Sequence, residues 1–313
     1  MKSLSIPQRF FIFLLLVLAL TCLISPWMAL GANWFAARSP DLLTEQIPFS
    51  RVFNRAFMIV AISLLIAGRR LLFPSYLKEL VVVRFSDAWL NLLTGFALAV
   101  LSFVFLLTLM AAADVYTPYF RLPLAESLSR LAGALASGVF AGFMEEVFFR
   151  GLMFLGLYDR DRPLRAYLLS NLLYSVIHFV KPDVAYFLDH LDPFVGFRHL
   201  LTTFEPFLEP LRLLPGICGL FLIGVVLCYA LARTGNLYLS VGLHASWIVG
   251  LKMIRVFGDF SREQLGWAFG ATDPKITSGV ATWIGVLLVG LAVRQLTRPD
   301  SRLVTDQPPA ATV

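Results

Sequence analysis

The stretch MEEVFFRG, residues 144–151, places two carboxylates and a guanidinium inside an apolar run. Charged groups in a membrane-buried helix cost roughly 2.5 to 3.5 kcal/mol each on insertion and usually face a cavity or a partner. On a helix, Glu146 and Arg150 are four residues apart on one face, where they can form an ion pair. Glu145 points about 100° away around the axis, so the same arginine cannot easily satisfy it. Its carboxyl is therefore a candidate general base or acid.

Two of the chain's histidines, His178 and His244, also fall in apolar segments. If successive helices alternate in direction, a rise of 1.5 Å per residue places Glu145 roughly 20 Å and His178 roughly 24 Å from the inner ends of their helices. His244 would lie at roughly 12 Å, which agrees within the error of the helix boundaries. A lone membrane histidine is more often an interhelical hydrogen-bonding residue. One Glu and two His on three successive helices instead predict a functional polar cavity.

The elements that must position these residues are membrane helices. The chain of 313 residues is 58% hydrophobic and 15% charged, which is the composition of a membrane protein. A bilayer-spanning helix needs about 20 apolar residues. Runs that approach this length are at about 10–31, 54–73, 90–113, 131–157, 164–181, 213–232, 236–256 and 277–294. The sequence therefore predicts an all-α, polytopic membrane helix bundle of about eight transmembrane helices.

Charge indicates an orientation for the bundle. The net charge is +6, and Lys and Arg are densest at 69–84 and 158–165. Basic loops favour the cytoplasmic side, so we expect both termini in the cytoplasm. The connection 180–212 mixes aromatics, prolines and charges, and we expect an amphipathic loop on the membrane surface, with a re-entrant lid as the alternative.

The chain resembles the CAAX-protease and bacteriocin-processing family of intramembrane proteases, which includes the Ras-converting type of prenyl-protein endopeptidase. EEVFFR at 145–150 matches the first motif of the family, two glutamates followed after three residues by arginine. Tyr174 and His178 match the second, an aromatic residue, usually Phe, four residues before a histidine. His244 matches the third, but Ile248 stands where the family has Asn or Asp. The resemblance covers about 126–256.

The resemblance implies roles for these residues. Glu145 and His178 would activate a water for attack on a peptide bond. Glu146 and Arg150 would hold the helix geometry as a structural ion pair, and His244 would help to stabilise the tetrahedral oxyanion.

In the family, the Asn of the third motif shares the task of stabilising the oxyanion, and Ile248 cannot donate a hydrogen bond. Loss of one oxyanion donor costs roughly 10² to 10³ in rate in a serine protease. Ser246, Trp247 or a backbone group would substitute, or the protein is a slow or non-proteolytic member. Tyr174, of the second motif, is a supporting residue of the site.

Metal dependence is a second open alternative. Glu145, His178 and His244 could form a three-ligand zinc site with an open position for water. No H-E-x-x-H spacing is present, and the resemblance to the Ras-converting enzymes favours a metal-free reaction.

The apolar runs, the composition of the last residues and the resemblance together predict a domain organisation and a location. We expect N-terminal transmembrane helices without motifs over 1–120, a protease core over 121–256, a last transmembrane helix with its lead-in over 257–296, and a disordered tail over 297–313. The expected partners are the lipid bilayer and a membrane-anchored peptide or protein substrate, not nucleic acid, and the expected location is a bacterial inner (plasma) membrane.

Two other functions compete with peptide hydrolysis. One is a non-catalytic membrane scaffold or maturation partner of the same fold, consistent with Ile248. The other is a proton-coupled transporter that uses Glu145 and His178 as a relay. Inverted repeats and helix pairs broken by Gly or Pro would support transport, and the sequence shows neither.

Overall fold

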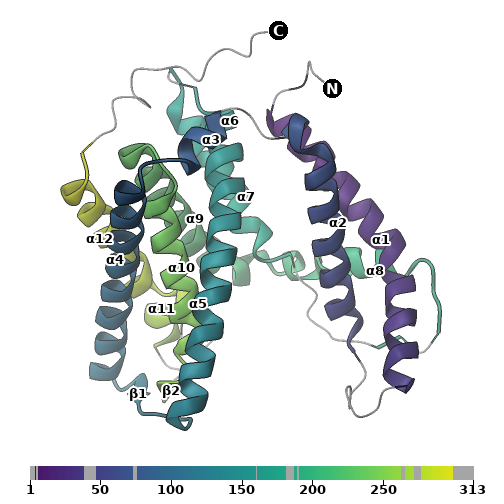
Figure 1. The fold of residues 1–313 in the computed structure, drawn as a ribbon. Coiled ribbons are helices and arrows are strands. Elements are labelled where there is room, and N and C mark those ends of the chain that lie inside the picture. The colour runs from purple at the N-terminus through teal and green to yellow at the C-terminus, as the bar shows by residue number, and fades with distance from the viewer. Residues whose placement is uncertain are drawn as a thin grey trace. The chain divides into compact units, whose positions relative to one another are not determined.

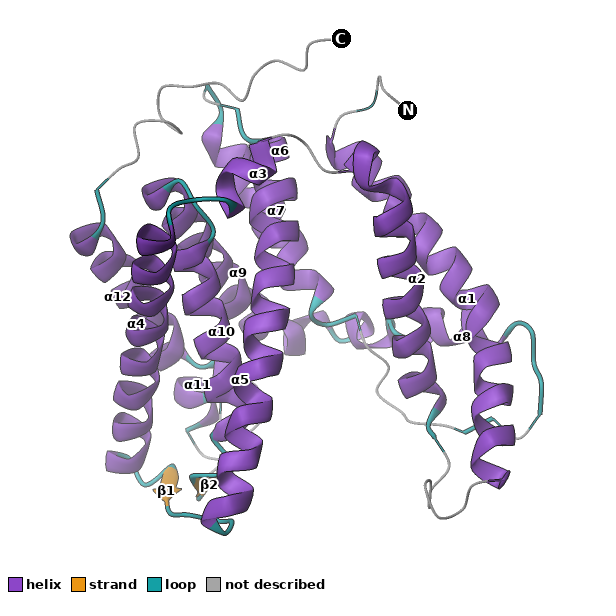
Figure 2. Cartoon of the chain, viewed as in Figure 1, coloured by secondary structure: helices purple, strands orange, loops and turns teal. Residues whose placement is uncertain are grey.

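The chain folds into two compact units that are each assembled from two segments of sequence. The structure, a computed structural model, describes residues 4, 6–38, 47–72, 76–159, 161–180, 187–188, 190–261, 265–270 and 276–298. The first unit consists of Met1–Pro74 and Val176–Leu213, and the second consists of Ser75–Ser175 and Leu214–Val313. Figures 1 and 2 show the helices and strands of both.

The first unit is built on two long helices, α1 (Ile6–Arg38) and α2 (Phe49–Leu72), which pack against each other. The short helix α8 (Val195–Thr202) lies against α1, and the 3-10 turn η2 (Glu205–Leu208) follows it. A Cβ on Gly196 would come within 2.2 Å of the Cys22 carbonyl oxygen, so glycine allows the two backbones to touch. The connection 180–212 thus contributes a helix to this unit.

The second unit contains the remaining elements, and α7 and α9 each cross the boundary between the units by a few residues. In chain order they are α3 (Tyr76–Val81), α4 (Phe85–Ala112), β1 (Tyr116–Pro118), α5 (Leu124–Glu146), the π-helix η1 (Val147–Phe154), α6 (Leu155–Leu157), α7 (Pro163–Ile177), α9 (Pro210–Thr234), α10 (Tyr238–Met253), β2 (Gly258–Phe260), α11 (Gly266–Phe269), η3 (Ile276–Ser278) and α12 (Val280–Leu296).

Helix α10 forms the core of the second unit. Its side chains are buried on nearly every side, and it packs against α4 and α5, beside which it runs in Figure 1. A Cβ on Gly95 would lie 2.3 Å from the Leu239 carbonyl oxygen, and one on Gly142 would lie 3.1 Å from the Ala245 nitrogen. Small residues of this kind let membrane helices approach closely. The backbones of α4 and α5 are therefore held against the helix that carries His244.

A short antiparallel pairing joins two connections of the second unit. β1 pairs with β2 in the register Tyr116 to Phe260 and Pro118 to Gly258. The Tyr116 hydroxyl donates a 2.7 Å hydrogen bond to the Ile254 carbonyl oxygen just beyond α10. This pairing ties the end of α4 to the end of α10.

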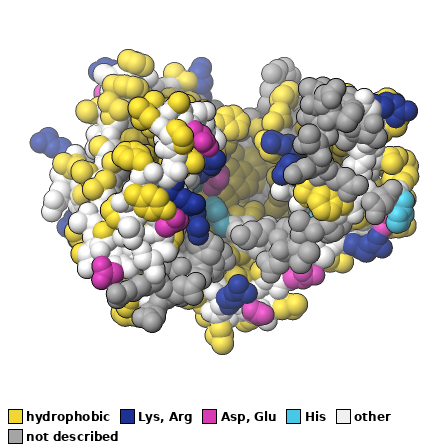
Figure 3. All heavy atoms as spheres, turned by 90° about the horizontal axis from the view of Figure 1, so that it is seen from below, with side chains coloured by type: hydrophobic (Ala, Val, Ile, Leu, Met, Phe, Trp, Pro, Cys, Tyr) yellow, Lys and Arg dark blue, Asp and Glu magenta, His cyan; other side chains and the backbone are white. Residues whose placement is uncertain are grey.

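The surface of the helices is that of a membrane protein. Large hydrophobic side chains such as Leu90, Phe140 and Leu291 are exposed, and on the face shown in Figure 3 hydrophobic side chains surround scattered charged ones. A water-facing surface would not present so many apolar groups. The predicted all-α bundle and the integral membrane location are confirmed.

The predicted number of eight spans is not confirmed. Each of the eight predicted ranges contains a helix, but among the described residues five helices are long and apolar enough to cross a membrane: those at 8–35, 49–68, 85–112, 124–157 and 210–234. Helices α7, α10 and α12 have 15, 16 and 17 residues. They are shorter than the roughly 20 residues that a bilayer core requires.

The division into four segments along the chain stays a prediction. Of the predicted disordered tail, residues from 299 on lie outside the described part of the chain.

Candidate active site

The two glutamates lie at the end of α5, where the helix changes its winding. α5 ends at Glu146, the π-helix η1 continues it from Val147 to Phe154, and α6 ends it at Leu157. A π segment widens the helix by one residue per turn and occurs frequently at functional sites. The motif EEVFFR therefore spans the transition from the α-helix to the π-helix.

Glu146 and Arg150 form a fully buried ion pair. Both side chains are 0% exposed, and Arg150 Nη1 lies 3.1 Å from Glu146 Oε1. Arg150 Nη2 also donates to the Gly224 carbonyl oxygen of α9 at 3.4 Å, and its guanidinium lies over the Tyr174 ring at 4.4 Å from the centroid. A buried ion pair needs such additional contacts to offset the cost of desolvation. Arg150 thereby links η1 to α7 and α9.

His244 contacts both glutamates. Its Nδ1 lies 2.7 Å from Glu146 Oε1, and its Nε2 lies 3.7 Å from Glu145 Oε2. The Tyr174 hydroxyl lies 3.4 Å from the same Nε2. Helices α5, α7 and α10 therefore meet at one imidazole.

The two carboxyls differ in exposure. The Glu145 side chain is 33% exposed, whereas that of Glu146 is completely buried. Neighbouring residues on a helix point about 100° apart, so only one of the two can face the core. Glu145 therefore has the more exposed side chain of the two, although its Oε2, which faces His244, is itself buried.

The contact with Glu146 assigns the tautomer of His244. An ionised carboxylate can only accept hydrogen bonds, so the short contact places a hydrogen on Nδ1. In the neutral imidazole, Nε2 then carries the lone pair and faces Glu145 and Tyr174. Glu146 thus fixes the tautomer and the orientation of the imidazole ring, as hydrogen-bonded carboxylates do for histidines in other functional sites.

The other predicted histidine is not placed beside these residues. His178 is the first residue after α7 and belongs to the first unit. Its approach to Glu145 therefore stays a prediction.

Of the residues predicted to replace the missing donor, Trp247 is hydrogen-bonded to α4 and Ser246 lies on another face of α10. Trp247 Nε1 donates to the Ser102 hydroxyl of α4 at 3.2 Å. Ser246 is buried two positions after His244, about 200° around the axis. Ile248 lies near Gly138 of α5, because a Cβ on that glycine would come within 3.6 Å of Ile248 Cγ2.

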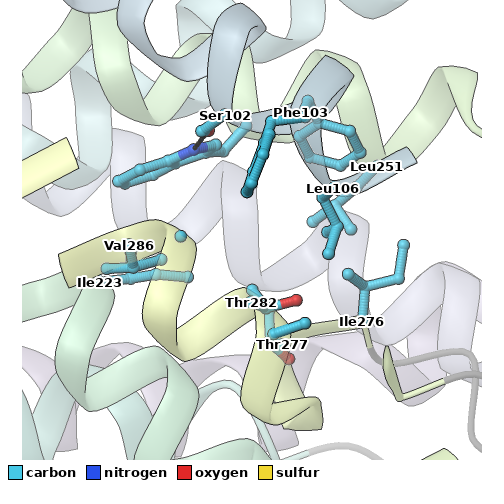
Figure 4. Close-up of a pocket in the computed structure, with 13 residues that line it drawn as sticks. Ser102, Phe103, Leu106, Ile223, Leu251, Ile276, Thr277, Thr282 and Val286 are labelled. Carbon is cyan, nitrogen blue, oxygen red and sulfur yellow. Dashed lines mark hydrogen bonds between the residues drawn. The ribbon is translucent and has the colours of Figure 1, made fainter. Parts of the chain in front are cut away.

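Trp247 also borders an apolar cavity of about 40 Å³. Figure 4 shows Ser102, Phe103 and Leu106 of α4 facing Thr277 and Thr282 across it. The lining is mostly hydrocarbon, and none of the lining residues has a carboxyl, imidazole or thiol group. The cavity is therefore separate in chemistry from the cluster around His244.

The Gly224 carbonyl is a site group that the sequence reasoning missed. It accepts from Arg150, and a Cβ on Gly224 would lie 2.4 Å from Asn171 Oδ1. Glycine keeps this position open for the close approach of α7 and α9. In the sequence, Gly224 is marked only as a glycine within an apolar run. That signal does not show that its carbonyl oxygen contacts Arg150.

The three-ligand zinc site stays a prediction. Glu145 and His244 belong to the second unit, where Oε2 and Nε2 lie 3.7 Å apart, and His178 belongs to the first unit. Within the described part of the chain, no group of three or more His, Cys, Asp or Glu side chains is arranged to hold a metal ion. His244 Nδ1 is occupied by Glu146.

Comparison with known proteins shows a similarity to one family over part of the chain. Residues 127–249 match the family model described as Type II CAAX prenyl endopeptidase Rce1-like. The matched range includes the whole cluster around His244 as well as His178. No curated protein and no solved structure matches the chain. Over this segment, about two fifths of the chain, the protein is similar to the Rce1-like, CAAX-type endopeptidases.

Proposed function

We propose that the protein hydrolyses a peptide bond of a membrane-anchored peptide or protein, with a water molecule activated by Glu145. One observation carries this proposal above all. Glu145 has a partly exposed side chain, and its Oε2 lies 3.7 Å from His244 Nε2, while the opposite nitrogen of that ring is held at 2.7 Å by the buried Glu146. A general base beside an oriented histidine is an arrangement suited to hydrolysis.

The reaction proceeds in two steps. The water oxygen bonds to the carbonyl carbon of the substrate while Glu145 takes one proton from the water, and the electron pair of the C=O double bond moves to the carbonyl oxygen. The tetrahedral intermediate then collapses, the C–N bond breaks, and Glu145 returns the proton to the leaving nitrogen. His178 is the proposed second partner of the water.

The buried residues prepare His244 for this reaction. Glu146 fixes the imidazole with the hydrogen on Nδ1, and Arg150 balances the charge of Glu146. In its protonated form His244 presents an N–H at Nε2, beside Glu145, and could donate it to the developing oxyanion. Glu146 and Arg150 thus act as positioning residues and touch neither water nor substrate.

The proposed substrate is a membrane-anchored chain because the site lies in helices of a membrane protein. The matching family is described as a prenyl endopeptidase, but a prenyl group on the substrate is not required by any contact in this site. The proposed location is a bacterial inner membrane with both termini in the cytoplasm, in keeping with the basic stretches at 69–84 and 158–165.

A comparison of protein termini tests the proposal. Membranes of cells lacking the gene are complemented with the wild-type chain or with Glu145→Gln, at matched amounts of folded protein. New termini that appear only with the wild type would establish hydrolysis and identify the substrate. Identical termini, with a loss-of-gene phenotype rescued by both chains, would overturn the proposal in favour of a non-catalytic scaffold.

A further inference from the structure

The Tyr174 hydroxyl lies at the reacting side of His244, 3.4 Å from Nε2. The residue is 1% exposed, so its position is set by the core. Its ring packs edge-to-face against Phe149 at 5.0 Å and lies under the Arg150 guanidinium at 4.4 Å. Both of these contacts involve the ring, and the hydroxyl oxygen has a further hydrogen bond with the Arg150 side chain. Removing the hydroxyl would leave the two ring contacts in place and would take away the hydrogen bond with Arg150.

The proposed hydrolysis needs a hydrogen-bond donor at this place. When the carbonyl oxygen of the substrate becomes an oxyanion, donors positioned beside it stabilise the transition state. His244 supplies one at Nε2 only in its protonated form, because the hydrogen of the neutral ring is on Nδ1 and is directed to Glu146. Ile248, one helical turn after His244, has a hydrocarbon side chain. A phenol is a neutral donor that needs no change of charge.

The length of the contact also suits this role. A distance of 3.4 Å is long for a hydrogen bond from a hydroxyl, whose usual donor-to-acceptor range is about 2.5 to 3.0 Å. Turning the hydroxyl hydrogen from Nε2 to a nearer oxygen would therefore cost little. Glu145 Oε2 lies 3.7 Å from the same nitrogen, so the carboxylate and the phenol hydroxyl both lie beside His244 Nε2.

We propose that Tyr174 is a catalytic residue whose hydroxyl donates a hydrogen bond to the carbonyl oxygen of the substrate as it becomes an oxyanion. This inference rests on the proposed hydrolysis. No proton is transferred from Tyr174, which keeps its hydrogen through both steps. The bond strengthens as charge develops on the oxygen, so its effect falls on the transition state more than on the bound substrate.

Tyr174→Phe tests this role in purified full-length protein. The probe is a peptide that spans a cleavage site found in the comparison of termini, together with the same peptide ending in an aldehyde at the scissile position. The aldehyde adds water to form a tetrahedral mimic of the intermediate. We expect kcat to fall by about 10² to 10³ with KM changed less than about threefold, and the affinity for the aldehyde to weaken by a factor similar to the loss in kcat.

Tyr167→Phe is the matched control. It removes the same hydroxyl from the same helix, about two turns earlier, and its ring packs against Phe154 at 4.8 Å. Its activity should stay within about twofold of the wild type. A second variant replaces Tyr174 by 4-aminophenylalanine, which keeps an N–H donor at the same position. This variant should retain much more activity than Tyr174→Phe, and it remains informative if Tyr174→Phe does not fold.

The outcomes separate this role from the proposed function. If Tyr174→Phe cleaves within threefold of the wild type while Glu145→Gln is inactive, hydrolysis holds and the donor role is overturned. A fall in kcat without weaker aldehyde binding, or equal losses in the two Tyr174 variants, would also overturn it, because a merely structural residue gives those results. If the wild type cleaves no peptide, the proposed function and the donor role both fall.

Discussion

Replacing Arg150 by alanine would remove the cation that faces Glu146 in the core of the second unit. The change deletes the 3.1 Å ion pair, the hydrogen bond to the Gly224 carbonyl oxygen and the contact with the Tyr174 ring. Glu146 would remain completely buried, with His244 Nδ1 as a hydrogen-bond partner at 2.7 Å.

The expected loss follows from these contacts. Removing one member of a buried ion pair costs about 3 to 5 kcal/mol, because the other charge stays buried. His244 still donates to Glu146, so we expect the lower end, about 3 kcal/mol. With about 2 to 4 °C per kcal/mol for a unit of this size, the melting temperature should fall by about 6 to 12 °C.

Arg130→Ala provides a matched control on the same helix. Arg130 pairs with Glu126 at the same four-residue spacing and a similar distance, 3.0 Å, but its side chain is 58% exposed. Exposed pairs are worth at most about 1 kcal/mol. Thermal unfolding of both variants in detergent, with their steady-state amounts in the membrane, measures the difference. Equal melting temperatures for the two variants would refute the reasoning that burial makes the Arg150 pair structural.

Three further predictions concern the base, the metal and the helix packing. Glu145→Gln should lower hydrolysis by at least about 10² while the melting temperature stays within about 2 °C, because the partly exposed carboxyl is needed as a base and not for folding; retained activity would contradict this. Treatment of the purified protein with a zinc chelator should leave hydrolysis unchanged, and activity that is lost and then restored by added zinc would show a metal site. Gly95→Ala should lower the melting temperature, since its Cβ would lie 2.3 Å from the Leu239 carbonyl oxygen, whereas Gly133→Ala has open space and should gain up to about 1 kcal/mol. Equal effects of the two alanines would argue against the close approach of α4 and α10.

The prediction of membrane helices, which depended on apolar composition and on the length of apolar runs, agrees with the structure. Apolar composition and run length predicted membrane helices because the bilayer demands continuous apolar segments with internal hydrogen bonds. The number of spans was harder to predict, since α7 and α10 combine apolar character with site residues and are shorter than a bilayer core. Hydropathy alone does not distinguish such helices from full spans.

The sequence by itself determined that Glu146 and Arg150 share one helix face and that Glu145 points elsewhere, because these relations follow from the angle between successive residues on a helix. It could not determine that His244, 98 residues away, takes Glu146 as the partner of Nδ1, nor that the Tyr174 hydroxyl lies beside Nε2. Those contacts depend on how closely α5, α7 and α10 approach and how each is rotated about its axis. Packing between distant segments sets both, through glycines such as Gly142 and Gly224, and only the tertiary structure decides it.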